Sequence, residues 1–425
     1  MAGRAHIVGG GLAGLSAAVH LVRAGRDVSL YEGAGHCGGR CRSYFEAALD
    51  RRIDNGNHLL LSGNRAAQEY LDVIGRPDGL PGGQPGGLVG PDRAAYPFLD
   101  LATGERWTVK MGAGRIPWWI FSAARRVPGS TPWDYLKALK LAGAGAGDTV
   151  AGCLDGANPV FAKFWEPLAV GVLNTSAEEG SAALLWPVIR ETFGRGEAAC
   201  RPLIARVGLS ETFIDPALAF LTERGAAISL NTRLRELGME NSRITALEFN
   251  TGSITLAEDD TVVLAVPPAP AAGLVPELAV PTESRAIVNG HFLLQRDAPD
   301  MSFLGLVGGT AQWLFVRGDV ASVTVSAADA LAEKPVDEIA DILWEDVARA
   351  LELGSAPLPA HRIVKEKRAT FAQTPEQVKR RPGVRTRWGN LFLAGDWTDT
   401  GLPATIEGTI LSGRTAYETV MISSP

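Results

Sequence analysis

Three glycines close to residue 10 restrict the fold of this chain more than any other feature. The run 5–8 is short and apolar, and the residues after the glycines repeat their apolar side chains at helical spacing. Gly9, Gly11 and Gly14 fit the pattern G-x-G-x-x-G. In this pattern the first glycine allows a tight turn, the second lets backbone approach a pyrophosphate, and the third lets helix and strand pack closely. The sequence therefore predicts a strand, a turn and a helix that bind a dinucleotide.

A carboxylate follows this turn at the expected spacing. The run 27–31 is a second strand candidate and ends at Glu32, 18 residues beyond Gly14 and close to the ~20 expected of a ribose-binding carboxylate. The pyrophosphate would lie at the positive helix N-terminus, against the backbone of Leu12 and Ala13. A glycine-rich turn alone can be purely structural, but the combination favours a dinucleotide site.

Two further segments indicate that the dinucleotide carries a flavin. Gly395 follows a buried strand signal, and Asp396 can accept hydrogen bonds from a ribityl or ribose hydroxyl. A helix that begins near Ile406 would direct free backbone N–H groups to the pyrimidine edge of a flavin. Gly39 and Arg40 lie in a second glycine turn, where a guanidinium could meet the pyrophosphate. The alternatives are an aspartate in an ordinary turn and an exposed arginine beside a flexible loop.

Composition narrows the class of protein. The chain has 425 residues, of which 46% are hydrophobic and 21% are charged, so we expect two or three globular domains. A formal net charge of -6 gives no reason to expect nucleic acid as a partner. Four cysteines without paired metal spacing predict neither a metal site nor a disulfide. No apolar stretch reaches the ~18 residues of a membrane span, and no signal peptide precedes the first strand, so we expect a cytoplasmic protein.

The motifs resemble those of the FAD-containing amine oxidase and phytoene desaturase superfamily. Glu32, Gly38-Gly39-Arg40 and the segment "AGDWTDTGLPATIEGTILSG" carry this resemblance. Within the superfamily, the chain is similar to the squalene-associated FAD-dependent desaturases, now assigned as hydroxysqualene dehydroxylases of bacterial hopanoid and squalene synthesis. That similarity is carried by four stretches: "DNGNHLLLSGN", "FWEPLAVGVLNTSAEEGSA", "KEKRATFAQTPEQ" and "NLFLAGDWTDTGLPATIEG".

The resemblance implies an α/β fold with a Rossmann-like FAD-binding domain of the GR2 type, found in amine oxidases, and an inserted α+β substrate domain. We assign residues 1–60, 201–270 and 386–425 to the FAD-binding domain. Residues 61–200 and 271–385 are assigned to the substrate domain with a lipid tunnel.

By the same resemblance, the backbone of Leu234 would contact the adenine, and Gly56, Asn57 and His58 would lie near the isoalloxazine. The implied reaction is the reductive removal of the allylic hydroxyl of hydroxysqualene, with hydride from flavin N5, to give squalene and water.

The departing hydroxyl needs a proton donor, and three residues are candidates. His58 can be protonated near neutral pH, although a lone histidine beside a glycine turn is about as often structural. Glu166 stands in the apolar setting "FWEPL", which raises a carboxyl pKa, but a paired or capping role is its alternative. Asp54 is the third and weaker candidate.

Partners are indicated by two further segments. The stretch 115–126, "RIPWWIFSAARR", concentrates aromatic residues between arginines and fits either a peripheral membrane contact or a buried helix. The run 361–387 carries nine Lys or Arg against two Glu; it could attract an anionic membrane, or be a solvated connection before the last strand. No second strand-turn-helix nucleotide unit is recognisable, so we expect an external electron donor.

Other functions are compatible with the same motifs. A carotenoid or phytoene-type desaturase would pass hydride from the lipid to the flavin. A flavin amine oxidase would need aromatic faces around a small amine. A prenyl-lipid carrier would not be an enzyme and should show damaged phosphate turns, whereas the turns here are intact.

Overall fold

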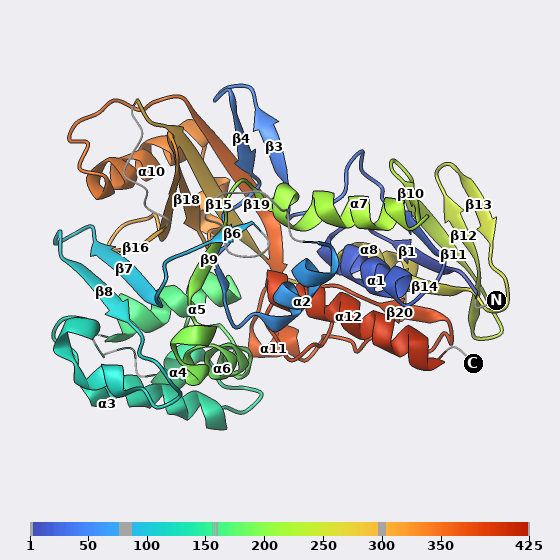
Figure 1. Ribbon diagram of the computed structural model, residues 1–425, viewed down its shortest axis with the longest axis horizontal. Coiled ribbons are helices and arrows are strands. Elements are labelled where there is room, and N and C mark those ends of the chain that lie inside the picture. The colour runs from blue at the N-terminus through green and yellow to red at the C-terminus, as the bar shows by residue number, and fades with distance from the viewer. Residues whose placement is uncertain are drawn as a thin grey trace.

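A parallel five-stranded sheet forms the centre of one half of the molecule (Figure 1). The structure is a computed structural model that describes residues 3–75, 87–154, 156, 158, 160–295 and 303–423. The strand order is β10 (Ala227–Ser229), β2 (Val28–Tyr31), β1 (Ala5–Val8), β14 (Thr261–Leu264) and β20 (Leu391–Leu393). All four pairings are parallel, so the carboxyl ends of the strands meet at one edge. The strand order reverses at β1. Open α/β sheets bind ligands at the carboxyl ends of the strands, beside the point where the order reverses.

Helices and a small antiparallel sheet enclose these strands. The helices are α1 (Leu12–Arg23), α2 (Arg65–Val73), α7 (Asp215–Glu223) and α12 (Ile406–Ser423). They share one apolar cluster with the sheet. A Cβ on Gly413 would lie 2.2 Å from the carbonyl oxygen of Ala13, so α12 crosses α1 at a distance that only glycine permits. A second cluster contains β11 (Leu234–Glu240), β12 (Arg243–Phe249), β13 (Gly252–Thr255) and α8 (Pro268–Leu274).

A seven-stranded mixed sheet forms the centre of the other half. Its order is β19 (His361–Phe371), β15 (Ser284–Leu293), β18 (Val320–Val325), β17 (Trp313–Arg317), β16 (Leu304–Val307), β7 (Ala95–Asp100) and β8 (Arg106–Lys110). Side chains alternate between its faces. Leu314 and Val316 pack with α9 (Asp329–Glu333) and α10 (Val336–Ala350), whereas Trp313 and Phe315 face a helical segment.

The helical segment lies between β8 and β9 in the chain. It contains η1 (Trp118–Phe121), η2 (Ala123–Arg125), α3 (Pro132–Leu136), η3 (Lys137–Gly143), α4 (Val150–Leu154), η4 (Phe161–Trp165), α5 (Glu166–Leu173), α6 (Ala182–Glu191), η5 (Phe193–Arg195) and η6 (Glu197–Ala199). Shorter elements connect the halves: β3 (Ser43–Glu46), β4 (Arg51–Asp54), β5 (Leu60–Leu61), β6 (Leu88–Val89), β9 (Pro202–Ala205), η7 (Ser210–Ile214) and α11 (Pro375–Val378). Among the described residues, none of the helices has both the length and the apolar character of a membrane span.

The predicted fold class, a Rossmann-like domain with an inserted α+β domain, is confirmed. The domain boundaries stay a prediction. One helix near the first boundary, α2, packs in the same apolar cluster as α1 and α12. Glu407 at the start of α12 accepts hydrogen bonds from the backbone N–H groups of Ala66 and Ala67, each at 2.9 Å, and so satisfies the first turn of α2.

A buried histidine makes the stability of this fold sensitive to acid. His291 on β15 is 0% exposed, its Nδ1 lies 2.8 Å from Ser322 Oγ, and burial lowers its pKa to about 4. The unfolded chain therefore binds a proton near pH 6.5, well before the folded chain does. We expect the free energy of unfolding to fall by about 3 kcal/mol from this residue between pH 6.5 and 4.

Chemical denaturation at a series of pH values checks this expectation. His291→Gln should flatten the acid limb of the stability curve, whereas His20, whose pKa burial also lowers to about 4, should keep its own contribution. An unchanged slope in His291→Gln would contradict the assignment.

Candidate functional site

The glycine turn after β1 combines two structural glycines with one that faces open space. Gly9 has φ +110°, and a Cβ there would lie 2.4 Å from the carbonyl oxygen of Ala265. A Cβ on Gly14 would lie 1.9 Å from the carbonyl oxygen of Gly9. Gly11 differs, because its φ of -74° suits any residue and its Cβ would meet nothing within 4 Å. The protein itself does not require glycine at Gly11, so the open space suits an approaching ligand.

The second glycine turn lies against the first. The Gly38 N–H donates to the Gly10 carbonyl oxygen at 2.8 Å, and a Cβ on Gly39 would be 3.5 Å from Gly11 Cα. Glu32, at the end of β2, accepts hydrogen bonds from the Gly10 N–H at 2.7 Å and the Ala34 N–H at 2.8 Å. The predicted carboxylate is thus held beside both turns.

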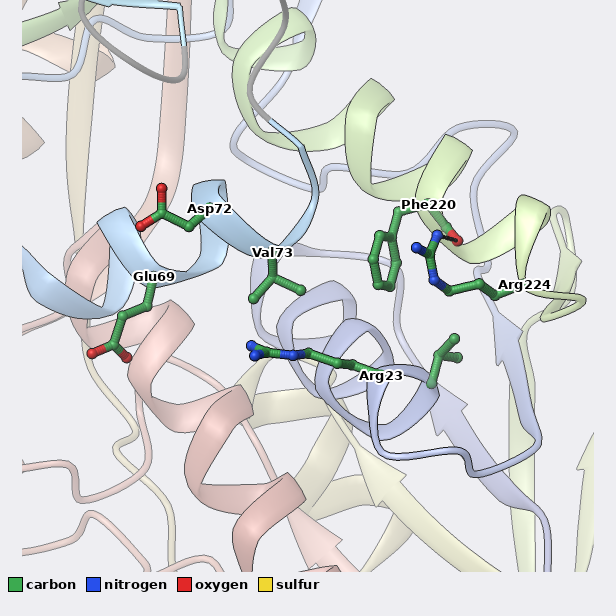
Figure 2. A pocket seen from close by; sticks show the side chains of 7 residues that line it. Arg23, Glu69, Asp72, Val73, Phe220 and Arg224 are labelled. Atoms are coloured by element: carbon green, nitrogen blue, oxygen red, sulfur yellow. Dashed lines mark hydrogen bonds between the residues drawn. The ribbon is translucent and has the colours of Figure 1, made fainter.

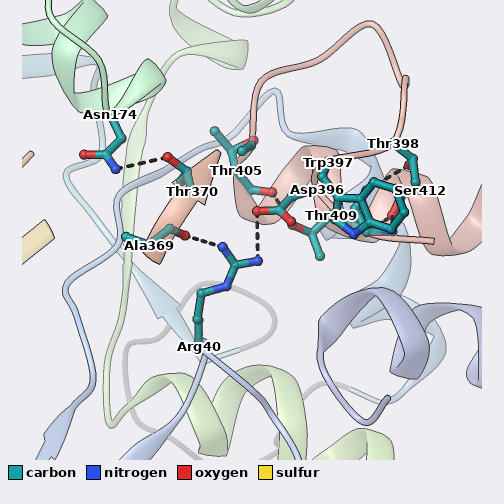
Figure 3. A network of polar contacts seen from close by, with 12 residues as sticks. Arg40, Asn174, Ala369, Thr370, Asp396, Trp397, Thr398, Thr405, Thr409 and Ser412 are labelled. Atoms are coloured by element: carbon teal, nitrogen blue, oxygen red, sulfur yellow. Dashed lines mark hydrogen bonds and ion pairs between the residues drawn. The ribbon is translucent and has the colours of Figure 1, made fainter. Parts of the chain in front are cut away.

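Arg40 and Asp396 bring the first and last segments of the site together (Figure 3). Arg40 Nη2 donates to Asp396 Oδ2 at 2.9 Å, and Nη1 donates to the carbonyl oxygen of Ala369 on β19. The Asp396 carboxylate raises the pKa of Arg40. The Asp396 side chain is 8% exposed and that of Arg40 is 42% exposed, so the guanidinium remains accessible to an anion.

The backbone after β20 is fixed by hydrogen bonds from deep in the core. Gly395 has φ +154° and donates its N–H to Ser412 Oγ on α12 at 2.9 Å. The indole N–H of the buried Trp397 donates to the carbonyl oxygen of Val266 at 2.9 Å. Ile406 begins α12 as predicted, and the N-terminus of this helix follows the same loop.

The structure attaches the loop with Gly56, Asn57 and His58 to the mixed sheet. Asn57 Nδ2 donates to Thr324 Oγ1 at 3.2 Å, and that hydroxyl donates to Asn289 Oδ1 at 2.7 Å. A Cβ on Gly56 would lie 3.0 Å from Asn289 Nδ2. The loop therefore lies on β15 and β18, where the two halves of the molecule meet.

His58 lies within electrostatic range of Arg40. Burial lowers the pKa of His58, the Arg40 charge lowers it further, and Asp54 partly offsets both effects. At pH 7 the ring is therefore mainly neutral, and the protonated form that can donate a proton increases as the pH falls.

Two other predicted acids occupy different settings. Asp54 is 3% exposed; it accepts hydrogen bonds from Ser43 Oγ at 2.6 Å and the Leu209 N–H at 2.9 Å, and it forms an ion pair with Arg317. These contacts favour a structural role. Glu166 begins α5, and burial raises its pKa, with a smaller contribution from Glu178. The helix rise places Glu166 about 12 Å from Asn174. Asn174 lies at the other end of α5, near Arg40 (Figure 3).

Leu234 lies close in the fold to Glu32. It begins β11, two residues after Thr232, whose N–H donates to the Glu32 carbonyl oxygen at 2.8 Å. The side chain of Leu234 is buried in the cluster under β11, which leaves its backbone as the part that a ligand can meet.

Sequence reasoning missed two residues that order the site. Gln373 is 0% exposed; it donates Nε2–H to the Leu173 carbonyl oxygen at 2.6 Å and accepts from the Ala404 N–H at 2.9 Å. It therefore connects the end of α5 to the loop before α12. Arg381, 7% exposed, donates to the carbonyl oxygens of Leu402, at 2.9 Å, and Thr398.

The interpretation of 361–387 as a solvated connection holds only in part, because most of its cationic side chains are exposed but much of its backbone is regular. Residues 361–371 form β19, residues 375–378 form α11, and Arg381 is buried against the loop that follows Asp396. The composition of the run gave no signal for this arrangement, but Gln373 lies in "KEKRATFAQTPEQ", one of the stretches that carry the family resemblance.

The segment 115–126 is partly buried and partly exposed. Ile120 is 1% exposed, whereas Ile116, Trp118 and Phe121 are 60%, 68% and 59% exposed.

A separate open groove of about 490 Å³ lies between α1, α2 and α7 (Figure 2). Arg23, Glu69 and Phe220 are among its lining residues, and it contains none of the predicted site residues.

Comparisons with known proteins agree with this arrangement. Residues 12–421 match the family described as flavin containing amine oxidoreductase. The hydroxysqualene dehydroxylase of Sinorhizobium fredii is 46% identical to this chain over 413 residues, or 97% of each chain. That of Rhodopseudomonas palustris is 45% identical over 417 residues, or 98% of each chain. An oxidoreductase from Methanosarcina mazei superimposes with a TM-score of 0.73 at 14% identity, over 98% of this chain and 100% of that one. The chain therefore belongs to the flavin-containing amine oxidoreductases and, within them, to the hydroxysqualene dehydroxylases, and is a flavin-dependent enzyme.

Proposed function

We propose that the chain binds FAD and catalyses the reductive dehydroxylation of hydroxysqualene to squalene. The observation that carries this proposal is the meeting of three distant segments at one edge of the parallel sheet, joined by the Arg40–Asp396 ion pair. The names of the two bacterial relatives support the substrate.

The residues present fit FAD in particular. Gly11 leaves open space beside the N-terminus of α1, and the accessible guanidinium of Arg40 would neutralise a pyrophosphate there. Glu32 would accept a hydrogen bond from the ribose, and the Leu234 backbone would contact the adenine. Asp396 would bind the ribityl chain, and the N-terminus of α12 would face the pyrimidine edge. Bound reduced FAD supplies a hydride at N5.

The reaction balances with one hydride and one proton. The C–O bond of the allylic alcohol breaks, a C–H bond forms at carbon, and the hydroxyl leaves as water after it gains the proton. We assign His58 in its protonated form as the proton donor to the leaving oxygen, because it lies near Arg40 and the meeting point of the two halves. Glu166, with its raised pKa, is the second candidate and Asp54 the third.

The chain's apolar side chains would keep this reaction dry. Trp313 and Phe315 on β17 belong to an apolar cluster that also contains Phe164 and Trp165. Exclusion of water protects a developing allylic cation until the hydride arrives. Regeneration of the reduced flavin requires an external electron donor.

The three alternative functions predict different results. A desaturase would oxidise phytoene with oxidised flavin, an amine oxidase would release peroxide from polyamines, and a lipid carrier would bind no flavin. The intact Gly11 turn and Arg40–Asp396 pair oppose the carrier.

Anaerobic mixing of photoreduced enzyme with hydroxysqualene tests the proposal. We expect flavin reoxidation at the rate of squalene formation. His58→Ala should lower that rate by about 100-fold or more, the loss typical of a missing proton donor, while flavin content stays unchanged. Glu166→Gln in parallel decides between the two donors, because the larger loss identifies the group that serves the leaving oxygen. No squalene together with phytoene oxidation would overturn the assignment.

A further inference from the structure

Five large apolar side chains are exposed within a short stretch of the helical segment. Ile116, Trp118, Phe121, Trp133 and Leu139 are 60%, 68%, 59%, 71% and 61% exposed. Single exposed apolar residues are normal, but a group that includes two tryptophans marks an interaction surface. We call these five residues the apolar surface. Ile116 precedes η1, and the other four belong to η1, α3 and η3, at the end of the molecule remote from the parallel sheet (Figure 1).

The backbone under this surface is well anchored. Trp119 packs on Tyr135 with ring centroids 5.0 Å apart, which joins η1 to α3. Tyr135 is 5% exposed, and its hydroxyl accepts a hydrogen bond from the Val127 N–H at 2.8 Å. Trp133 stands two residues earlier, about 200° around the helix from Tyr135, and therefore points away from the core. The exposure is a property of the folded segment.

The charges around the apolar surface are mostly positive. Residues 110–143 contain six Lys or Arg and one acidic residue, in a chain whose formal net charge is -6. The acidic residue, Asp134, accepts hydrogen bonds from the Thr131 N–H and hydroxyl, both at 2.8 Å, and from Asn158 Nδ2 at 2.7 Å. Asp134 Oδ1 also lies 3.9 Å from Lys137 Nζ, so these two charges are paired within the segment and the other five cations make up the positive excess.

We propose that the apolar surface docks this enzyme on an anionic lipid bilayer. Tryptophan side chains favour the level of the lipid headgroups, and each nearby cation is attracted to an anionic surface. A second protein would bury the same tryptophans but would not by itself explain the excess of positive charge. The inference rests on the proposed function only for the reason why this enzyme would bind a membrane. Membrane binding itself is measured separately from turnover.

The position of the surface suits a substrate that dissolves in the membrane. Ile120 and Tyr135, directly beneath it, belong to the same apolar cluster as Phe98 and Trp313 of the mixed sheet. The segment that carries the apolar surface therefore shares its core with the mixed sheet, on which the His58 loop also lies.

Vesicle co-sedimentation of the purified holoenzyme tests the proposal. Vesicles of phosphatidylcholine with about one third phosphatidylglycerol should bind the enzyme, with affinity that falls as salt screens the charges. Trp118→Ser combined with Trp133→Ser should weaken binding by about tenfold or more, because both side chains lose their buried apolar area. Phe45→Ser is the matched control: Phe45 is also 60% exposed but lies on β3, on another side of the molecule.

Two outcomes would overturn the inference. One is equal binding by the double variant and the wild type. The other is no vesicle binding, together with a concentration-dependent dimer that the double variant loses, which would identify a protein contact. Turnover of detergent-dispersed hydroxysqualene should be unchanged in the double variant. If no enzyme form turns over hydroxysqualene, the proposed function fails while the vesicle result still stands.

Discussion

Replacement of Gly11 by valine is expected to abolish flavin binding and to leave the folded apoprotein intact. The φ of -74° at Gly11 suits any residue, and an added Cβ meets nothing within 4 Å, so neither the backbone conformation nor an atom beside the β-carbon opposes a side chain here. The valine would fill the space into which the pyrophosphate fits. We expect the flavin affinity to fall by a factor of about 100 or more, which corresponds to roughly 3 kcal/mol.

Flavin absorbance of the purified variant and thermal unfolding of the apoprotein together check this expectation. Gly273→Val is the matched control, because its Cβ also meets nothing within 4 Å but lies on α8, outside the site. Gly14→Val should behave differently and fail to fold, since its Cβ would lie 1.9 Å from the Gly9 carbonyl oxygen. A yellow Gly11→Val protein with normal flavin content would refute the placement of the cofactor.

Replacement of Arg317 by methionine is expected to lower the free energy of unfolding by about 3 kcal/mol, the lower end of the usual loss for a buried ion pair, because the Arg317 side chain is 26% exposed. Arg317 Nη2 pairs with Asp54 Oδ2, and the Asp54 side chain is 4% exposed. Without the guanidinium, the carboxylate would keep only the Ser43 hydroxyl and the Leu209 N–H as donors. A buried, unpaired charge would remain.

A double-mutant cycle separates this effect from lost packing. Asp54→Asn in the Arg317→Met background should recover part of the stability, because the unpaired charge is removed. Arg51→Met is the control: Arg51 pairs with Asp319 at 2.7 Å, but that arginine side chain is 42% exposed, so its loss should be much smaller. Equal losses in Arg317→Met and Arg51→Met would show that burial of the pair is unimportant.

The parts of the molecule that could be predicted from the sequence are those whose structure is determined by residues close to them in the chain. Gly14 is required by a contact within its own strand-turn-helix unit, Gly9 by its φ of +110° in the turn, and Glu32 stands at a spacing that the unit fixes. The order of the mixed sheet has no such cause. Its parallel pairing of β16 with β7 places Gly305 opposite Phe98, and no local pattern contains that pairing.

The residues of the candidate site also fall into those that a local sequence pattern predicts and those that it does not. Arg40 and Asp396 are recognisable because each follows a glycine turn, and the structure brings them together. Arg381 and Gln373 were missed because their importance depends on hydrogen-bond partners in other elements. The residue type alone does not identify those partners. Asp54 was a candidate acid because its ion pair could not be recognised from the sequence: the partner, Arg317, is 263 residues away.

The Arg40–Asp396 pair also has a consequence for synthesis of the protein. The two residues are 356 positions apart; β20 ends just before Asp396, and α12 begins after it. At about 5–20 residues per second, a ribosome needs roughly 20–70 s between them. A nascent chain that already contains the first glycine turn therefore lacks the strand and helix that complete the nucleotide cradle. Flavin loading is confined to nearly full-length chains, and products that terminate before residue 391 should remain colourless.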